Sequence, residues 1–270
     1  MTPAHRAELK AELSAGLRQG MLYAAAVLVL VLPPNTRTAA PPAPIAMGAT
    51  SATRLAVAPP RQPFHDPAFE ALPASADARQ VVGWIAESGD NRNLPYVVLD
   101  KRNARVYVFT PAGHFVATSP VLLGYTPGDD SVAGIGTRPI ADVRPEERTT
   151  PAGRFISAPG KNASKEDVIW VDYDDAVSMH RVRPTNPKER RLQRLASPDP
   201  AQRRISYGCI NVPVAFFNTV LWPRLGTRAA VIYVLPEVKD VREVFAGLPA
   251  PALPTPTLQT ARSQQADERL

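Results

Sequence analysis

The sequence predicts a mainly β fold for the middle of the chain. Three observations support this: short apolar runs recur, several of them alternate with polar residues, and turn-forming residues separate them. The runs cover residues 96–100, 104–110, 114–123, 168–173, 176–180 and 230–235. With 270 residues, 44% of them hydrophobic, the chain can bury one substantial core and carry appendages. We therefore expect one folded domain, over residues 75–238.

The N-terminus carries the cations Arg6, Lys10 and Arg18 before an apolar run over residues 21–32. A spanning helix needs about 20 apolar residues, whereas a shorter run after cations is typical of an export signal. A buried amphipathic helix is disfavoured because the run has no polar face. Residues 1–40 are therefore predicted to be a signal peptide or a short anchor that contacts the inner membrane. The domain is expected in the periplasm or cell envelope.

Proline-rich tracts flank the predicted domain. Of 30 prolines, ten lie in residues 33–73 and five in residues 236–256. Such composition lacks the periodic apolar residues that a core requires. Residues 41–74 are predicted to be a linker, and residues 239–270 a disordered tail.

The domain is expected to begin with a short helix. Asp77 and Gln80 resemble a capping box, and an apolar stripe from Val81 to Ile85 ends near Gly89. Trp84 belongs to that stripe, which favours a core position over a sugar-stacking one.

Hairpins follow, with turns predicted at residues 101–103 and 111–113. The glycine-rich stretch 124–136 lacks the ending of a phosphate loop and nearby metal ligands, so a mobile surface loop is expected. Thr149–Gly153 predicts a tight turn before a strand at residues 154–156, either a hairpin corner or the border of a substrate groove. Residues 214–221 have the apolar face of a helix that packs on the sheet.

A basic insert spans residues 181–204. It holds eight Lys or Arg and two Asp or Glu, so it accounts for the whole net charge of +6. Pro187 can occupy a first helical turn, and Leu192 and Leu195 are expected to share one face. Two interpretations stay open: a helical lid whose cations receive substrate carboxylates, and a solvated charge run. The insert has no aromatic residue, which argues against a nucleic-acid partner.

Cys209 is the only cysteine, and it follows Gly208 and precedes an Asn-Val-Pro sequence that predicts a helix entrance. A thiolate near a helix N-terminus has a lowered pKa, which suits a nucleophile. A base is also needed. Of the histidines at positions 5, 65, 114 and 180, only His180 ends an apolar run. His180 and Cys209 are therefore the candidate base and nucleophile.

The segment Ser206–Asn211, with His180 upstream and Thr150–Phe155 before both, resembles the catalytic domain of L,D-transpeptidases, the YkuD-like family. The resemblance covers about half of the chain, residues 96–236. Tyr207 stands where most members have a second histidine, and the 29 positions from His180 to Cys209 exceed the usual spacing. The resemblance implies a β-sandwich of curved mixed sheets with short helices.

The resemblance also implies a reaction: Cys209 forms a thioester with a peptidoglycan tetrapeptide stem and passes it to an amine. The carbonyl of Arg181 would orient His180, and amides around Tyr207, Gly208 and Cys209 would hold the oxyanion, with the Tyr207 hydroxyl as a further donor. Ser206 and Asn211 would hold the loop. No cofactor or metal is implied.

Other acceptors stay open. Water would make the chain an L,D-carboxypeptidase or amidase, and a cell-wall-linked protein is another acceptor. A non-catalytic module that binds the cell wall is the alternative of another class.

Overall fold

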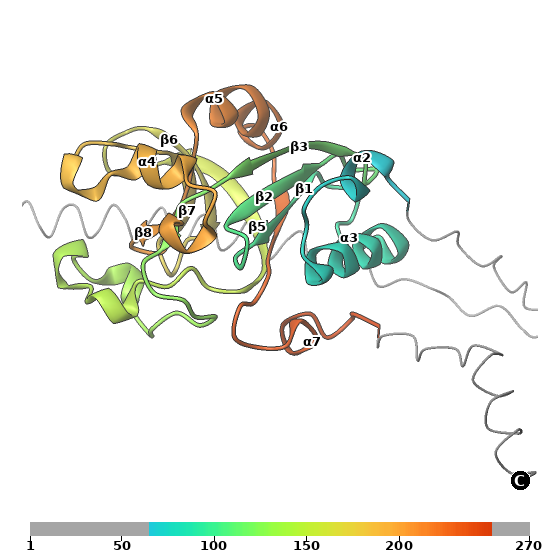
Figure 1. The fold of residues 1–270 in the computed structure, drawn as a ribbon, viewed down its shortest axis with the longest axis horizontal. Helices are drawn as coiled ribbons and strands as arrows, with labels where there is room; N and C mark the ends of the chain where they lie inside the picture. Colours follow the sequence, from blue (N-terminus) through green and yellow to red (C-terminus); the bar gives the residue numbers. More distant parts are fainter. Residues whose placement is uncertain (1–64, 250–270) are drawn as a thin grey trace, which may run out of the picture. The chain divides into compact units, whose positions relative to one another are not determined.

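A mixed sheet organises residues 65–249, the part of the chain that the computed structural model describes (Figure 1). Its eight strands in this part of the chain are β1 (Tyr96–Asp100), β2 (Arg105–Phe109), β3 (Phe115–Pro120), β5 (Gly153–Lys161), β6 (Asp167–Asp172), β7 (Val177–Arg181), β9 (Ile210–Val212) and β10 (Ala230–Val234). They lie in the order β3-β2-β1-β10-β5-β6-β7-β9. The β1–β10 and β7–β9 pairs are parallel and the others antiparallel. The predicted mainly β fold is confirmed.

Short elements surround this sheet. The strands β4 (Leu123–Gly124) and β8 (Arg204–Ser206) form a separate parallel pair. The α-helices are α2 (Pro67–Glu70), α3 (Ala76–Ser88), α4 (Arg191–Ala196), α5 (Val214–Phe216), α6 (Trp222–Leu225) and α7 (Val241–Val244). Single 3-10 turns occur at Ile135–Thr137, Ile140–Asp142, Pro145–Glu147, Pro187–Glu189 and Pro200–Arg203, and a π turn occupies Phe217–Leu221. None of the helices in residues 65–249 is both long and apolar enough to cross a membrane.

Strand β5 joins two halves of the sheet. Its residues 153–157 pair with β10, and its residues 158–161 pair with β6. Apolar side chains from both halves gather in one buried core, including Val97, Leu99, Val106, Val108, Ile169, Met179, Ile210 and Ile232. A mixed sheet with both halves against one core agrees with the layered β arrangement that the family resemblance implied.

A second core lies on the other face of the β1–β2–β10 half, under α3 (Figure 1). Successive side chains of a strand point to opposite faces, so Val97 and Leu99 enter the first core while Tyr96 and Val98 enter the second. Trp84 of α3 packs here, 6.2 Å from the Tyr233 ring. The predicted helix is confirmed in its position. Ser75 caps it, however, and not Asp77.

The folded part extends beyond residues 75–238 at both ends. Within the expected linker, Asp66 caps α2, and Phe69 is buried with its ring 5.3 Å from those of Tyr107 and Phe109. Within the expected tail, α7 and the segment after it bury Val241 and Leu248. Isolated apolar residues in a Pro-rich stretch have no periodicity, so the sequence does not indicate that they are buried. The structure shows that they belong to the second core. The predicted signal segment lies outside the described residues.

The stretch 124–136 is not the free surface loop that was expected. Asp129 is buried, and its carboxylate accepts the backbone amides of Glu237, Val238 and Lys239 at 2.7–2.8 Å. Lys101 also donates to Asp129 Oδ1 at 2.7 Å. The partners of Asp129 are more than 100 residues away or, in the case of Lys101, in the turn after β1, so its burial is a tertiary effect.

Candidate active site

The alternation of β7 and β9 places the polar residues of the site on one face. Val177 and Met179 enter the first core, so Ser178 and His180 point away from it. On β9, Ile210 and Val212 enter the same core. Because His180 and Asn211 are register partners in the parallel β7–β9 pair, their side chains lie side by side.

Cys209 directly precedes β9, at the end of the loop that follows β8. Its Sγ lies 3.7 Å from Ser178 Oγ and 3.6 Å from the Ala176 carbonyl oxygen, and the residue is partly exposed. A helix does begin after the Asn-Val-Pro sequence, with Pro213 at its N-cap, but Cys209 does not lie at its N-terminus. Residues 210–212 pair with β7 as a strand, and α5 begins only at Val214. Support for a thiolate therefore comes from the neighbouring imidazole and not from a helix.

The loop before Cys209 requires glycine. Gly208 has φ +126°, and a Cβ at this position would lie 2.8 Å from the Thr149 carbonyl oxygen. Ser206 Oγ donates to the Cys209 carbonyl at 2.6 Å and accepts the Gly208 amide at 3.2 Å. Thr150 Oγ1 donates to the Gly208 carbonyl at 2.8 Å. These bonds fix the backbone that presents the thiol.

A backbone contact fixes the tautomer of His180. Its Nδ1 lies 2.8 Å from the carbonyl oxygen of Arg181, which can only accept, so Nδ1 carries a proton. In the neutral ring, Nε2 is then the nitrogen that accepts a hydrogen bond. The Asn211 side-chain nitrogen lies 3.3 Å from Nε2. His180 is thus arranged as a proton acceptor on its Nε2 side.

The two titratable groups shift each other's pKa. Burial alone would raise the pKa of Cys209, but the nearby His180 imidazole and contacts with Ser178 lower it below its ordinary value. Burial alone would lower the pKa of His180, but the nearby Cys209 thiol and the Arg181 carbonyl raise it. Both shifts favour transfer of the thiol proton to the imidazole. The pair can therefore supply a thiolate nucleophile.

Arg191 reaches this site from the basic insert, which the sequence did not indicate. Its Nη1 donates to Asn211 Oδ1 at 2.5 Å, so the Asn211 NH₂ must face His180 and the Cys209 carbonyl, 3.2 Å away. Glu189 holds the Arg191 guanidinium from the other side. Asn211 is fully buried, and its orientation depends on an arginine 20 positions upstream.

The inward face of α4 differs from the predicted one. Leu195 is buried against Leu122 and Val182, but Leu192 is 55% exposed. Arg191 and Leu195 are four positions apart, and residues at that spacing share a helix face. That spacing was the one available signal that Arg191, whose side chain is 12% exposed, belongs to the site, because arginines are mostly exposed.

Tyr207 lies under the guanidinium of Arg148, whose Cζ is 3.9 Å from the ring centroid. Arg148 itself donates from Nε and Nη2 to the Val143 carbonyl. Within residues 65–249 no hydrogen bond joins the Tyr207 hydroxyl to another group. The face of the Tyr207 ring is therefore held by Arg148. Separately, the turn at Thr149–Gly153 borders the loop of Cys209 through Thr149 and Thr150.

The predicted site residues Cys209, His180, Arg181, Ser206, Gly208 and Asn211 thus come together, with Tyr207 beside them. No group of three His, Cys, Asp or Glu side chains in the described part of the chain is placed to hold a metal ion.

Comparison with known proteins gives limited help. No protein-family model and no curated protein matches the chain. Among solved structures, the chain is similar to the NMR structure of the catalytic domain of the E. faecium L,D-transpeptidase, with 17% identity and a TM-score of 0.29. That match covers 52% of this chain and 96% of the other. A TM-score this low carries no weight for fold or reaction, so the chemistry has to be derived from the side chains.

Proposed function

We propose that this protein is a cysteine acyltransferase that acts on peptidoglycan stem peptides, an L,D-transpeptidase. The observation that carries the proposal is the pairing of Cys209 with His180, in which Nδ1 donates to the Arg181 carbonyl and Nε2 is the ring nitrogen that can take the thiol proton. A nucleophile, a base and a group that orients the base are the three parts that covalent acyl transfer requires.

The reaction proceeds in two halves. His180 Nε2 takes the proton of Cys209, and the thiolate attacks the carbonyl between the third and fourth residues of the stem. The carbon–nitrogen bond then breaks, and the leaving amine takes the proton from His180. An acceptor amine gives its proton to His180 as it attacks the thioester, and the thiol is restored. Atoms and charges balance without an added oxidant or cofactor.

Backbone amides are the proposed oxyanion donors. The Gly208 amide already donates to Ser206 Oγ, so it serves the loop, and the amides of Tyr207 and Cys209 are the donors we propose. The Tyr207 hydroxyl is a further candidate. Its ring is anchored by Arg148, which holds the phenol near the loop.

The substrate class rests on the resemblance of residues 206–211 to the L,D-transpeptidase motif. The acceptor is proposed to be the amine of a neighbouring stem. Water or a cell-wall-linked protein would use the same thioester, and no feature of the described residues favours either of them.

Acylation of purified variants tests the proposal. A carbapenem provides a reactive acyl group, and intact-mass spectrometry detects the adduct. Cys209→Ala should form none, and His180→Ala should react slower by about two to four orders of magnitude, the usual contribution of a positioned base. Circular dichroism serves as the folding control. An adduct on Cys209→Ala would overturn the nucleophile assignment, and no adduct on the wild type would favour the binding module.

Incubation with a disaccharide tetrapeptide then identifies the acceptor. A cross-linked dimer indicates an amine acceptor, whereas a tripeptide monomer indicates water. Finding only the monomer would replace the transferase by a carboxypeptidase.

We also propose that the domain is exported, because the cations and apolar run of residues 1–40 are typical of an export signal. Since Phe69 packs in the second core, an alkaline phosphatase fusion should be joined after Pro63 and not inside the domain. Activity in a Gram-negative host is expected. An inactive phosphatase beside an active cytoplasmic reporter at the same junction would refute export.

A further inference from the structure

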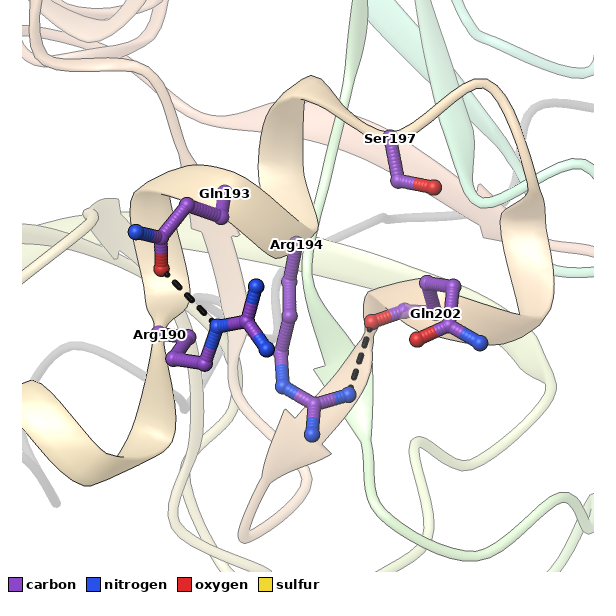
Figure 2. Close-up of a pocket in the computed structure, with 5 residues that line it drawn as sticks. All are labelled: Arg190, Gln193, Arg194, Ser197 and Gln202. Atoms are coloured by element: carbon purple, nitrogen blue, oxygen red, sulfur yellow. Dashed lines mark hydrogen bonds between the residues drawn. The ribbon is translucent and has the colours of Figure 1, made fainter.

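A small cavity opens on the basic insert, away from the thiol itself. Five residues line it, and Figure 2 shows them around one hollow: Arg190, Gln193, Arg194, Ser197 and Gln202. Its volume is about 190 Å³. A wider hollow of about 620 Å³ shares Arg194 and Gln202 with it and continues along Tyr125 and Arg204. The two hollows form a continuous lining on the outside of the insert.

Arg194 is held in place by the backbone. Its Nε donates to the Glu189 carbonyl at 2.9 Å and its Nη1 donates to the Gln202 carbonyl at 3.0 Å. A guanidinium has five N–H donors in a planar fork, so three of them are left for another partner. Arg190 Nε donates to Gln193 Oε1 at 3.3 Å, and the two arginine side chains lie side by side (Figure 2).

The cavity holds positive charge without a balancing carboxylate. In the described part of the chain neither Arg190 nor Arg194 forms an ion pair, and the nearby Glu189 is bound by Arg191. In the adjoining hollow the carboxylate of Glu237 is bound by Arg204. Two neighbouring guanidinium groups repel each other, and an anion between them would remove that repulsion and gain charge-assisted hydrogen bonds.

The backbone at Arg190 is unusual for such a residue. Its φ of +51° and ψ of +38° lie in the left-handed region, which favours Gly or Asn. A strained conformation persists only where the surrounding structure imposes it, and such positions gather at ligand sites. Here it ends the 3-10 turn Pro187–Glu189 and places the Arg190 side chain beside Arg194.

We propose that the cavity between Arg190 and Arg194 binds a carboxylate group of the peptide substrate, an inference that rests on the proposed function for the identity of the peptide. The planar fork of a guanidinium matches a carboxylate in a bidentate way. Arg191 lies between these two arginines in the chain and donates to Asn211. A ligand in the cavity would therefore hold the insert in the position in which Arg191 orients Asn211. The chemical class of the ligand is an acidic peptide. Phosphate shares the charge and is distinguished by experiment.

Equilibrium binding tests this without chemistry. The full chain carrying Cys209→Ala is titrated calorimetrically at low salt with acetyl-Glu-Glu, with the neutral acetyl-Gln-Gln-amide, and with inorganic phosphate. We expect binding of the acidic peptide alone. Arg190→Gln and Arg194→Gln should each weaken it about tenfold or more, the effect of losing one charged hydrogen bond.

Arg224→Gln is the matched control. The Arg224 guanidinium is also held by backbone carbonyls, those of Thr219 and Val220, and forms no ion pair among the described residues. Arg224→Gln removes the same charge from a residue that does not line the cavity. It should leave binding unchanged within about twofold, because an exposed charge outside the site contributes little. Equal weakening by Arg224→Gln would show that only net charge matters and would overturn the site.

A second variant separates binding from folding. Arg190→Gly relieves the left-handed backbone, so it should not lower the melting temperature but should still weaken acetyl-Glu-Glu binding about tenfold. Binding that survives this change would refute the role of Arg190. Phosphate binding as tight as that of the peptide would overturn the carboxylate assignment. Because no thioester is formed, these results are independent of the acylation experiment.

Discussion

Two pairs of titratable groups lie near Thr150: Lys101 with Asp129, and Cys209 with His180. The pairs differ in how many of their polar atoms have hydrogen-bond partners. In the first, Lys101 Nζ donates to Asp129 Oδ1, the Gly128 carbonyl and the Thr150 carbonyl, at 2.5–2.9 Å. In the second, the pKa of Cys209 is lowered and that of His180 is raised, each by the other group. Thr150 contacts both, because its hydroxyl donates to the Gly208 carbonyl.

The difference shows how the chain separates stability from reactivity. The side chains of Lys101 and Asp129 are 0% and 1% exposed, and three acceptors around Nζ require all three ammonium protons. Burial alone would raise the pKa of Asp129, but Lys101 and three backbone amides lower it to about 2. Burial lowers the pKa of Lys101 as well. The pair is closed to solvent and fixed, whereas the thiol is partly exposed and can reach a substrate.

Breaking the buried Lys101–Asp129 pair should have the largest effect on stability. Lys101→Met leaves the carboxylate of Asp129 buried without its cation, while Glu237 keeps Arg204. The change should lower the free energy of unfolding by about 3 to 5 kcal/mol. Guanidinium denaturation measures it. Lys161→Met removes the exposed pair with Asp167 and should cost about 0 to 1 kcal/mol. Equal losses in the two variants would show that the burial of Lys101 is unimportant.

The stability of the Lys101→Met variant should also depend on pH differently from that of the wild type. The folded-state pKa of Asp129 is lowered, so its stabilising contribution is present above the ordinary carboxyl pKa of about 4 and is lost as pH falls toward 2. Without Lys101 the pKa of Asp129 should rise, and acid unfolding should begin at a higher pH than in the wild type. An acid transition that does not move would contradict the assignment.

Replacing Arg191 beside the Cys209–His180 pair should have an intermediate effect on acylation. Arg191→Gln removes a nearby positive charge that lowers the pKa of His180, so the His180 titration should move to higher pH. The Asn211 amide also loses its anchor, which should slow acylation up to about tenfold, the value of one hydrogen bond. NMR of the imidazole carbon and carbapenem kinetics measure the two effects.

Arg191→Lys separates charge from geometry. Lysine keeps the positive charge but lacks the planar guanidinium that binds Asn211. The pKa of His180 should therefore return toward its wild-type value, while acylation stays slower. If Arg191→Gln leaves the titration of His180 in place, Arg191 does not act on the pair.

The smallest effect is expected at Tyr207. Tyr207→Phe keeps the ring against Arg148 and removes only a hydroxyl that has no hydrogen bond within the described residues, so acylation should slow by about threefold or less. Tyr207→Ala also removes the ring and should slow it further. A phenylalanine variant as inactive as Cys209→Ala would instead make the phenol part of the chemistry.

The sequence predicted the elements that depend on local patterns. Strands β1, β2, β6, β7 and β10 match their alternating runs, and α3 ends at Gly89 in the left-handed conformation that a helix end favours. The pairing of the sole cysteine with His180 also followed from the chain, because the residue types and their positions relative to the strands are local properties.

The tertiary structure decided the contacts between distant residues. Phe69 and Leu248 have no periodic neighbours, Asp129 looked like a loop residue, and Arg191 looked like part of a charged surface. Each is fixed by partners far along the chain: Tyr107 for Phe69, Lys101 for Asp129 and Asn211 for Arg191. Alternation and residue chemistry predicted most of the strands and the candidate base and nucleophile. Which polar groups are buried and matched depends on the assembled sheet, because burial and hydrogen-bond satisfaction are properties of the surroundings and not of the residue.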